Sequence, residues 1–260
     1  MKILLLGRNG QVGWELERTL APLGELKAFD RAALDLADVP RLAAAVRALQ
    51  PEVIVNAAAY TAVDKAETDR EAAFAVNATA PRVLAEEAKR IGALLVHYST
   101  DYVFDGEKQA PYVEDDATHP INVYGESKLA GEQAITKSGC RHLILRTSWV
   151  YGPRGKNFML TMLRLAKERP ELRVVDDQVG APTSSPEIAR ATIALLEKRA
   201  EGLYHMTAGG ETSWCGFARA ILAQARIAIP VVPIRTEEYP TPARRPRNSR
   251  LDCSRLCEDT

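Results

Sequence analysis

The sequence predicts an α/β fold in which a doubly wound parallel sheet carries a smaller C-terminal lobe. Three observations lead to this prediction. Short apolar runs alternate with amphipathic helical patterns over the first 150 residues. A glycine-rich turn follows the first apolar run directly, and the alternation loosens after Val150. Strand and helix patterns that alternate in this way are typical of a Rossmann-type parallel sheet with helices on both faces.

The predicted strands are continuous apolar runs rather than alternating ones, so both of their faces are expected to be buried. They cover residues 2–6, 25–29, 52–58, 93–99 and 141–148. Between them, the predicted helices cover residues 11–23, 39–49, 70–92 and 124–139. In the first helix Val12, Leu16 and Leu20 recur at helical spacing, which gives an apolar face for packing on the sheet.

Beyond Val150 the pattern predicts helices over residues 158–167, 186–198 and 212–225, the last capped by Ser213 or Thr212. A strand is expected over residues 202–207, and the Pro- and Arg-rich stretch 239–250 is expected to be a loop. We therefore expect one domain over residues 1–150 and a smaller lobe over residues 151–260, some segments of which return to the first domain.

The composition excludes several classes of protein. In 260 residues, 34 Lys and Arg balance 34 Asp and Glu, so no basic field exists to hold nucleic acid or an anionic membrane. No apolar run approaches the roughly 20 residues of a membrane span, and the first run ends at Gly7 without a cleavage site. The four cysteines (140, 215, 253 and 257) lack metal-site spacing. We expect a reduced cytoplasmic protein without a metal.

Gly7, Gly10 and Gly13 form a G-x-x-G-x-x-G turn between the first predicted strand and the first predicted helix. Glycines let the backbone approach a pyrophosphate, whose charge a helix N-terminus stabilises. The spacing differs from the common G-x-G-x-x-G, and packing glycines are the alternative explanation. The position favours a dinucleotide-binding site, to which Asn9, Gln11 and Val12 of the same turn are expected to contribute.

Residues at the ends of the second and third strands are expected to contact the rest of the cofactor. Asp30 stands where an acidic side chain binds ribose hydroxyls and favours NAD. Arg31 and Arg8 could instead hold a 2′-phosphate, so NADPH and NADH both remain open. The other predicted contacts are Asp35 and Leu36 after the second strand, and Ala57, Ala58, Ala59 and Tyr60 after the third.

Tyr124 and Lys128 lie four residues apart in a predicted helix, so they share one face. Thr100 stands at the end of the fourth strand, on the edge where open parallel sheets bind ligands. A ketone that receives a hydride needs a proton donor and a hydrogen-bond donor. We expect Tyr124 to be the donor, with its pKa lowered by the Lys128 ammonium, and Thr100 to bind the carbonyl. An ordinary surface pair on the helix is the alternative.

Motifs along nearly the whole chain resemble the dTDP-4-dehydrorhamnose reductase family of the extended short-chain dehydrogenases/reductases. They read GRNGQVG, NAAAYTAVDKAE, HYSTDYVFDG, YGESKLAGE, LRTSWVYG, DQVGAPT and RPRNSRLD. The resemblance implies NAD(P)H-dependent reduction of the C4 ketone of dTDP-4-dehydro-L-rhamnose to dTDP-L-rhamnose. It places the hydroxyl, Tyr and Lys roles on Thr100, Tyr124 and Lys128, and it puts Trp149 beside the sugar.

The later half is accordingly expected to be a substrate-binding lobe. The residues expected to bind substrate are Val63, Asp64, Thr100, Trp149, Asn157, Arg245 and Asn248. For Asp64 and Arg245, a cap, a salt bridge or a solubilising loop are the alternatives. The resemblance also implies a monomer or a homodimer; Glu15 matches a metal-linked dimer contact of the family, but its partners cannot be assigned. Relatives usually continue with a further helix after the final motif, so we expect weaker packing of the smaller lobe here.

Two other functions stay open at this stage. The first is a non-catalytic, cofactor-binding regulatory subunit, a use that a relative of this family has in methionine adenosyltransferase. The second is an epimerase or dehydratase of the same superfamily. Dehydratases place two acidic residues after the strand-end threonine, whereas Asp101 is followed here by Tyr102.

Overall fold

The computed structural model describes residues 1–260 and contains a six-stranded sheet in which every neighbouring pair is parallel. From one edge to the other the strands are β2 (Glu25–Phe29), β1 (Lys2–Leu6), β3 (Val53–Asn56), β4 (Leu94–Thr100), β5 (His142–Thr147) and β10 (Gly202–His205). The chain passes from β1 outward to β2 and then crosses back to β3. The order therefore reverses beside β1, which is where open α/β sheets bind ligands.

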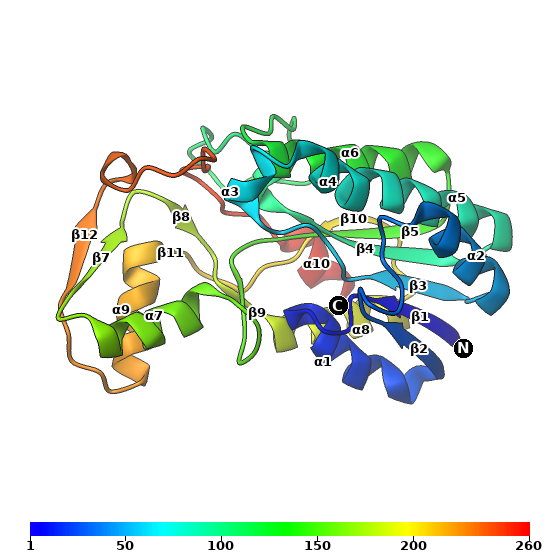
Figure 1. Ribbon diagram of the computed structural model, residues 1–260, viewed down its shortest axis with the longest axis horizontal. Helices are drawn as coiled ribbons and strands as arrows, with labels where there is room; N and C mark the ends of the chain where they lie inside the picture. The colour runs from blue at the N-terminus through cyan, green and yellow to red at the C-terminus, as the bar shows by residue number, and fades with distance from the viewer.

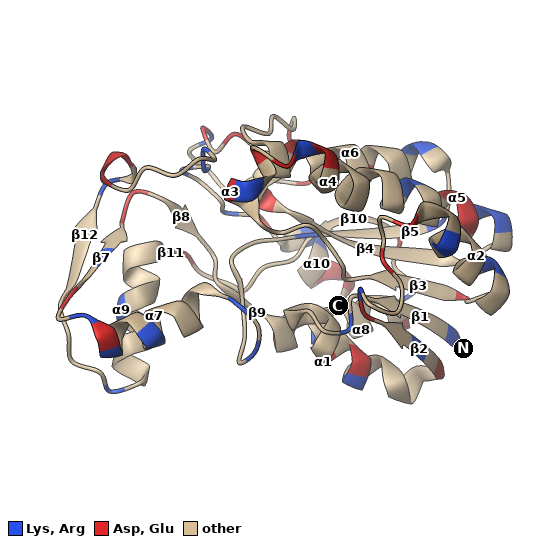
Figure 2. Cartoon of the chain, in the orientation of Figure 1, with Lys and Arg blue, Asp and Glu red and all other residues tan.

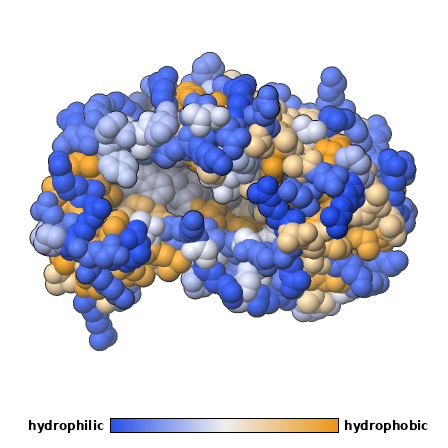
Figure 3. Space-filling model, viewed as in Figure 1, coloured by the Kyte–Doolittle hydropathy of each residue, from blue (hydrophilic) through white to orange (hydrophobic).

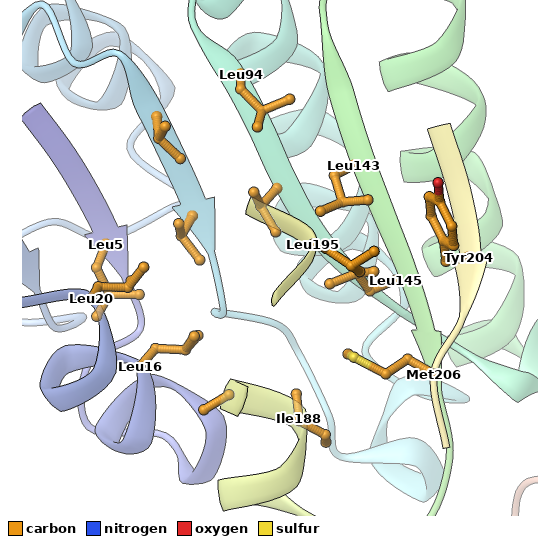
Figure 4. Close-up of a cluster of buried hydrophobic side chains, with 14 of the residues drawn as sticks. Leu5, Leu16, Leu20, Leu94, Leu143, Leu145, Ile188, Leu195, Tyr204 and Met206 are labelled. Carbon is orange, nitrogen blue, oxygen red and sulfur yellow. The ribbon is translucent and has the colours of Figure 1, made fainter. Parts of the chain in front are cut away.

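Helices cover both faces of the sheet (Figure 1). α1 (Gln11–Leu20) and α8 (Ser185–Glu197) pack together on one face, while α2 (Val39–Leu49), α5 (Ala80–Ile91) and α6 (Val123–Ser138) cover the other. Each face has its own apolar cluster of 16 buried residues. In the α1/α8 cluster, Leu16 and Leu20 meet Leu5 of the sheet, and Ile188 and Leu195 approach from α8 (Figure 4). The doubly wound parallel fold predicted from the sequence is confirmed.

Polar caps fix the starts of the helices that matter for the site. The Asn122 side chain accepts a hydrogen bond from the Gly125 N–H, which begins α6 one residue before Tyr124. Asp38 caps α2, and Ser213 caps α9 (Trp214–Gln224), the cap predicted from the sequence. α6 ends at Gly139 in the left-handed region, where glycine carries no steric cost.

A smaller lobe stands beside the carboxyl ends of the strands (Figure 1). Its core of nine buried residues joins α7 (Phe158–Glu168) and α9 to a two-stranded sheet of β7 (Leu172–Val175) and β12 (Val231–Ile234). Two further pairs have only two residues per strand: β6 (Val150–Tyr151) with β9 (Thr183–Ser184), and β8 (Val179–Gly180) with β11 (Thr212–Ser213). These short pairs lack a sequence signal, because two residues show no periodicity.

Several segments depart from the boundaries expected from the sequence. β10 pairs with β5 and α8 packs on α1, so both belong to the larger part although they follow residue 150. The long helix expected over 70–92 is divided into α4 (Arg70–Phe74), a π-helical turn at Ala75–Thr79, and α5. A four-residue helix, α3 (Val63–Ala66), precedes them.

The terminal segment forms a short helix, α10 (Ser254–Asp259), which packs on β10 rather than on the smaller lobe. Leu256 joins the apolar cluster of the α1/α8 face, and the Tyr204 hydroxyl donates to Asp259 at 2.6 Å. The residues after the final motif therefore contact the central sheet rather than the smaller lobe.

Charged residues of both signs are spread over the helices and loops of both lobes (Figure 2). None of the helices combines the length and the apolar character that crossing a bilayer requires.

We expect the Leu95→Ala substitution to lower the free energy of unfolding by about 2–5 kcal/mol, because Leu95 is fully buried near the start of β4, an inner strand of the sheet, and truncation leaves a cavity. Urea unfolding measures this loss. Val113→Ala removes apolar atoms from a side chain that is 39% exposed and is the control, with an expected change within about 0.5 kcal/mol. Equal effects of the two substitutions would contradict the layered core described above.

Candidate active site

The glycine turn brings the first strand, the first helix and the end of β3 into close contact. Gly7 has φ +86°, and a Cβ on it would lie 2.7 Å from the Ala58 nitrogen. A Cβ on Gly13 would lie 2.0 Å from the Gly7 oxygen, so α1 could not pack this closely with any other residue there. A Cβ on Gly10 would meet nothing nearer than 3.2 Å. Gly7 and Gly13 are thus required for close backbone packing, whereas Gly10, at the start of α1, is the least crowded of the three.

A cleft of about 620 Å³ opens beside this turn, along the carboxyl ends of the central strands. All fifteen residues that the sequence predicted to bind cofactor line it: Gly7, Asn9, Gly10, Gln11, Val12, Asp30, Arg31, Asp35, Leu36, Ala57, Ala58, Ala59, Tyr60, Tyr124 and Lys128. The cleft thus runs from the end of β2 to the first turns of α6. Its volume lies within the range of small-molecule sites.

At the β2 end of the cleft, Asp30 accepts hydrogen bonds from the Ala33 N–H and the Asn9 amide, both at 2.9 Å. The Ala33 N–H is the largest cause that lowers the pKa of Asp30, with a smaller effect from Asn9. Arg31 lines the cleft and lies 3.1 Å from Asp35. Arg8 does not line the cleft, because its guanidinium is bound to Glu17 on α1. Of the two arginines considered from the sequence, only Arg31 therefore lines the cleft, although the Arg8 charge also lowers the pKa of Asp30.

Tyr124 and Lys128 occupy the first two turns of α6 and both line the far end of the cleft. Burial raises the pKa of Tyr124 to about 12, and a hydrogen bond with Thr100 opposes that shift. The expectation that Lys128 lowers the pKa of Tyr124 is wrong, because burial is the largest cause of the shift and raises this pKa. The Lys128 ammonium donates instead to the Tyr98 carbonyl at 2.6 Å, and burial lowers its own pKa to about 8.

Thr100 is buried at the end of β4, where its hydroxyl donates to Asp101 Oδ1 at 3.0 Å and accepts from the Tyr102 N–H at 3.2 Å. Burial raises the pKa of Asp101 to about 6. The second Asp101 oxygen, Ser99 Oγ and Thr147 Oγ1 are buried and have no hydrogen-bond partner. Buried polar atoms normally have partners, so the Ser99 and Thr147 hydroxyls, which line the cleft, mark a place for polar groups from outside the chain.

Ser99 and Thr147 also line the cleft, and the sequence did not predict either of them as a site residue. The signal for both was their position at the carboxyl ends of β4 and β5, where Thr100 and Thr147 are direct neighbours. Lys156 was missed as well. It is an exposed residue of the loop after β6 and reaches the cleft from the smaller lobe.

The π-helical turn before α5 holds α6 in place. The Asn77 amide donates to Ser127 Oγ and to the Tyr60 carbonyl, each at 3.0 Å, and its oxygen accepts from the Tyr60 N–H at 2.8 Å. A Cβ on Gly131 would lie 2.2 Å from the backbone carbonyl oxygen of Asn77, so α6 approaches this turn closely. The wider turn lets Asn77 tie the β3 loop to the helix of Tyr124, a use typical of π-bulges near functional sites.

Two residues expected to bind substrate are bound to each other. Arg245 donates to both oxygens of Asp64, at 3.0 and 2.8 Å, and Asp64 begins α3 beside Val63. Asn157 caps α7 and donates to Gln11 Oε1 at 2.8 Å. Asn248 is buried and donates to two backbone carbonyls, Lys108 and Ala110. The polar atoms of these side chains therefore already have protein partners.

Trp149, after the end of β5, has left-handed backbone with φ +47°. Its ring stacks on Trp214 of α9, with centroids 3.6 Å apart, and the Trp214 N–H donates to Gln178 at 3.2 Å. A Cβ on Gly180 would lie 2.7 Å from the Trp149 ring. This stack joins the larger part to the smaller lobe. The surface is hollowed between the two parts (Figure 3).

A parallel sheet with a glycine turn at its switch point, and a Tyr-x-x-x-Lys pair beside a strand-end threonine, define a nicotinamide-dependent reductase of the short-chain dehydrogenase type. The family model described as "RmlD substrate binding domain" matches residues 1–260. This chain belongs to the dTDP-4-dehydrorhamnose reductase family, as the sequence resemblance implied.

Individual relatives cover almost the whole chain. The dTDP-4-dehydrorhamnose reductase of Burkholderia thailandensis is 53% identical over 99% of this chain and 92% of that protein. The crystal structure of the Clostridium acetobutylicum reductase has a TM-score of 0.96 and 41% identity, covering 100% of this chain and 92% of that one. The Bacillus anthracis reductase, in complex with NADP, has a TM-score of 0.96 and 38% identity, covering 99% and 92%.

We expect Gly10→Val to weaken NADPH binding by about a hundredfold or more while the chain stays folded. The Cβ would lie 3.2 Å from the Gly7 oxygen, and the methyl groups on it would stand at the start of α1 and displace a bound pyrophosphate by roughly 1 Å. Fluorescence titration measures the affinity, and thermal unfolding checks the fold. Gly209→Val is the control, because a Cβ on Gly209 meets nothing within 4 Å. Unchanged affinity in a folded Gly10→Val variant would remove the turn from the cofactor site.

Proposed function

We propose that this chain catalyses NAD(P)H-dependent reduction of the C4 ketone of dTDP-4-dehydro-L-rhamnose to dTDP-L-rhamnose. The observation that carries the proposal is the pair of Tyr124 and Lys128 at one end of the cleft, with the buried Thr100 hydrogen-bonded to Tyr124. The curated relatives at about half identity bear the name of this reductase. We also infer a cytoplasmic location, where nucleotide sugars and reduced nicotinamides are made.

The residues of the cleft fit a nicotinamide dinucleotide. The position of Gly10 on the cleft wall and the uncapped start of α1 suit a pyrophosphate. Asp30 suits the adenosine ribose, and Ser99 and Thr147 offer hydroxyls without protein partners at the other end. When bound, the reduced cofactor supplies the hydride. Lys128 is placed to hold the nicotinamide ribose, one helical turn beyond Tyr124.

Tyr124 is the proposed proton donor to the C4 oxygen. Its pKa of about 12 keeps the phenol protonated throughout the neutral range, as an acid requires. Thr100 adds a hydrogen bond to the same oxygen once its hydroxyl turns away from Asp101. In its protonated form, Lys128 would stabilise the phenolate that forms as the proton leaves.

The smaller lobe is the proposed substrate-binding part, with the sugar between Tyr124 and Trp149. Arg245 and Asp64 would then contribute as a preformed pair rather than as a free cation. Asn157 and Asn248 would contribute through the loops that they fix. We propose a monomer or a homodimer as the working form.

The comparisons support this catalytic function over a non-catalytic regulatory subunit, because the named relatives are reductases. Dehydration is disfavoured by the residue after Asp101. Tyr102 stands there, and its partly buried ring packs edge-on against Tyr124 with centroids 5.8 Å apart. No second carboxylate therefore stands beside Asp101 in the chain.

We expect both NADPH and NADH to support turnover, since Asp30 favours a free ribose hydroxyl and Arg31 can bind a 2′-phosphate. Arg31→Ala should weaken NADPH roughly ten- to hundredfold and leave NADH unchanged, because a charge-assisted hydrogen bond contributes about 1.5–3 kcal/mol. Arg8→Ala is the matched control, since Glu17 holds that guanidinium away from the cleft. A wild-type preference above about a thousandfold, or a loss confined to Arg8→Ala, would contradict this balance.

We expect Tyr124→Phe to lower turnover by about a hundred- to ten-thousandfold, the usual contribution of a positioned acid, while NADPH affinity survives. Loss of NADPH absorbance with the dTDP-4-keto sugar measures the rate, and UDP and GDP analogues test base selectivity. Tyr102→Phe, the edge-on neighbour, is the control and should keep the rate within about tenfold. Near wild-type turnover in Tyr124→Phe would remove Tyr124 from the mechanism and favour a binding subunit.

A further inference from the structure

A buried chain of hydrogen bonds runs from Asn56 through His97 to Lys128. The function proposed above gives no role to Asn56 or His97. The Asn56 amide nitrogen lies 3.1 Å from His97 Nδ1, and His97 Nε2 lies 3.2 Å from Lys128 Nζ. Asn56 and His97 are each 1% exposed and Lys128 is 2% exposed. At one end the Ala58 N–H donates to Asn56 Oδ1 at 3.3 Å, and at the other Lys128 donates to the Tyr98 carbonyl.

The direction of this chain is determined by its fixed end. A backbone N–H can only donate, so Ala58 orients the Asn56 oxygen toward itself and the Asn56 NH₂ toward His97. His97 Nδ1 must then accept. Burial lowers the pKa of His97 well below its usual value, so the ring is neutral and carries its single proton on Nε2. That N–H faces Lys128.

The two protonation states of Lys128 meet this N–H differently. An ammonium has donors only, so it would oppose another donor at 3.2 Å. A neutral amine has a lone pair that can accept from His97 and still donates to Tyr98. If His97 carried its proton on Nδ1 instead, Nε2 could accept from the ammonium, but the Nδ1–H would face the Asn56 NH₂, which is also a donor. If the Asn56 amide were then flipped, its NH₂ would face the Ala58 N–H, again a donor against a donor.

The other groups around Lys128 leave this balance in place. On α6, Tyr124 lies one turn before it and Glu132 one turn after it. The Glu132 charge favours the ammonium, but both Glu132 oxygens are bound by Arg146 of β5, at 2.9 and 2.7 Å. From β4 only His97 and the Tyr98 carbonyl contact the amine. No unpaired anion therefore compensates the Lys128 charge.

We propose that His97 is a positioning residue that sets the protonation of Lys128, because its Nε2–H, directed by Asn56 and Ala58, favours the neutral amine. The equilibrium is a simple one: the ammonium releases a proton to solvent, and the amine accepts the His97 hydrogen bond. This inference rests on the proposed function, because it concerns the lysine beside the proton donor. Burial, which lowers the pKa of Lys128, favours the neutral amine as well.

The first test is a pH titration of Lys128 Nζ by NMR, with isotope-labelled lysine in the enzyme without cofactor and Lys128→Met for assignment. We expect a midpoint near 8, far below that of ordinary lysine. A midpoint at the ordinary lysine value would overturn the proposal without any variant. The titration needs no turnover, so it also separates this proposal from failure of the proposed reaction.

The second test replaces His97 in two ways. His97→Gln puts an amide oxygen where Nε2 stands, so Lys128 should titrate at least one pH unit higher, a tenfold gain for the ammonium, and the alkaline limb of kcat/KM should move with it. His97→Asn reaches only Asn56 and should move the Lys128 midpoint less than His97→Gln does. His142→Gln, a histidine of β5 bound to the Cys140 carbonyl, is the control and should leave it unchanged. An unchanged midpoint in folded His97→Gln would overturn the proposal.

Discussion

The close approach of backbone to backbone at Gly7 and Gly13 is the contact on which the rest of the site depends. A Cβ on residue 13 would lie only 2.0 Å from the Gly7 oxygen. Because glycine has no Cβ, α1 can begin close to the end of β1. The same turn touches Ala57 and Ala58 after β3. Since β1 and β3 flank the switch point, this contact sets where the cleft opens, and the small residues there keep it wide enough for a dinucleotide.

The larger sheet and the cofactor side of the cleft could be predicted from the sequence, because both depend on local patterns. Continuous apolar runs mark buried strands, and parallel strands bring their ends to one edge. Ser99 and Thr147 were not predicted as site residues, because a hydroxyl side chain within an apolar strand is equally expected to be buried in the core. The pairing of Arg245 with Asp64 escaped for another reason: 181 residues separate them, and no local pattern reports such a contact.

The raised pKa of Tyr124 shows what the four-residue spacing of Tyr124 and Lys128 cannot predict. A four-residue interval tells which side chains share a helical face, but not where a flexible amine ends. Lys128 Nζ lies against β4, where it contacts the Tyr98 carbonyl and His97, and not against the phenol. Burial then decides both pKa values, raising that of Tyr124 and lowering that of Lys128.

The path of the chain between its two parts has a consequence for how such an enzyme could change its substrate. The chain leaves the central sheet after β5, returns at α8, leaves again after β10, and returns at α10. The smaller lobe is thus two separate insertions that fold into a common core, rather than one appended module. Neither excursion can be exchanged alone without breaking the pairing of β8 with β11 or β7 with β12. Recombination that creates a new specificity must therefore transfer both excursions together, while the sheet beneath them stays as it is.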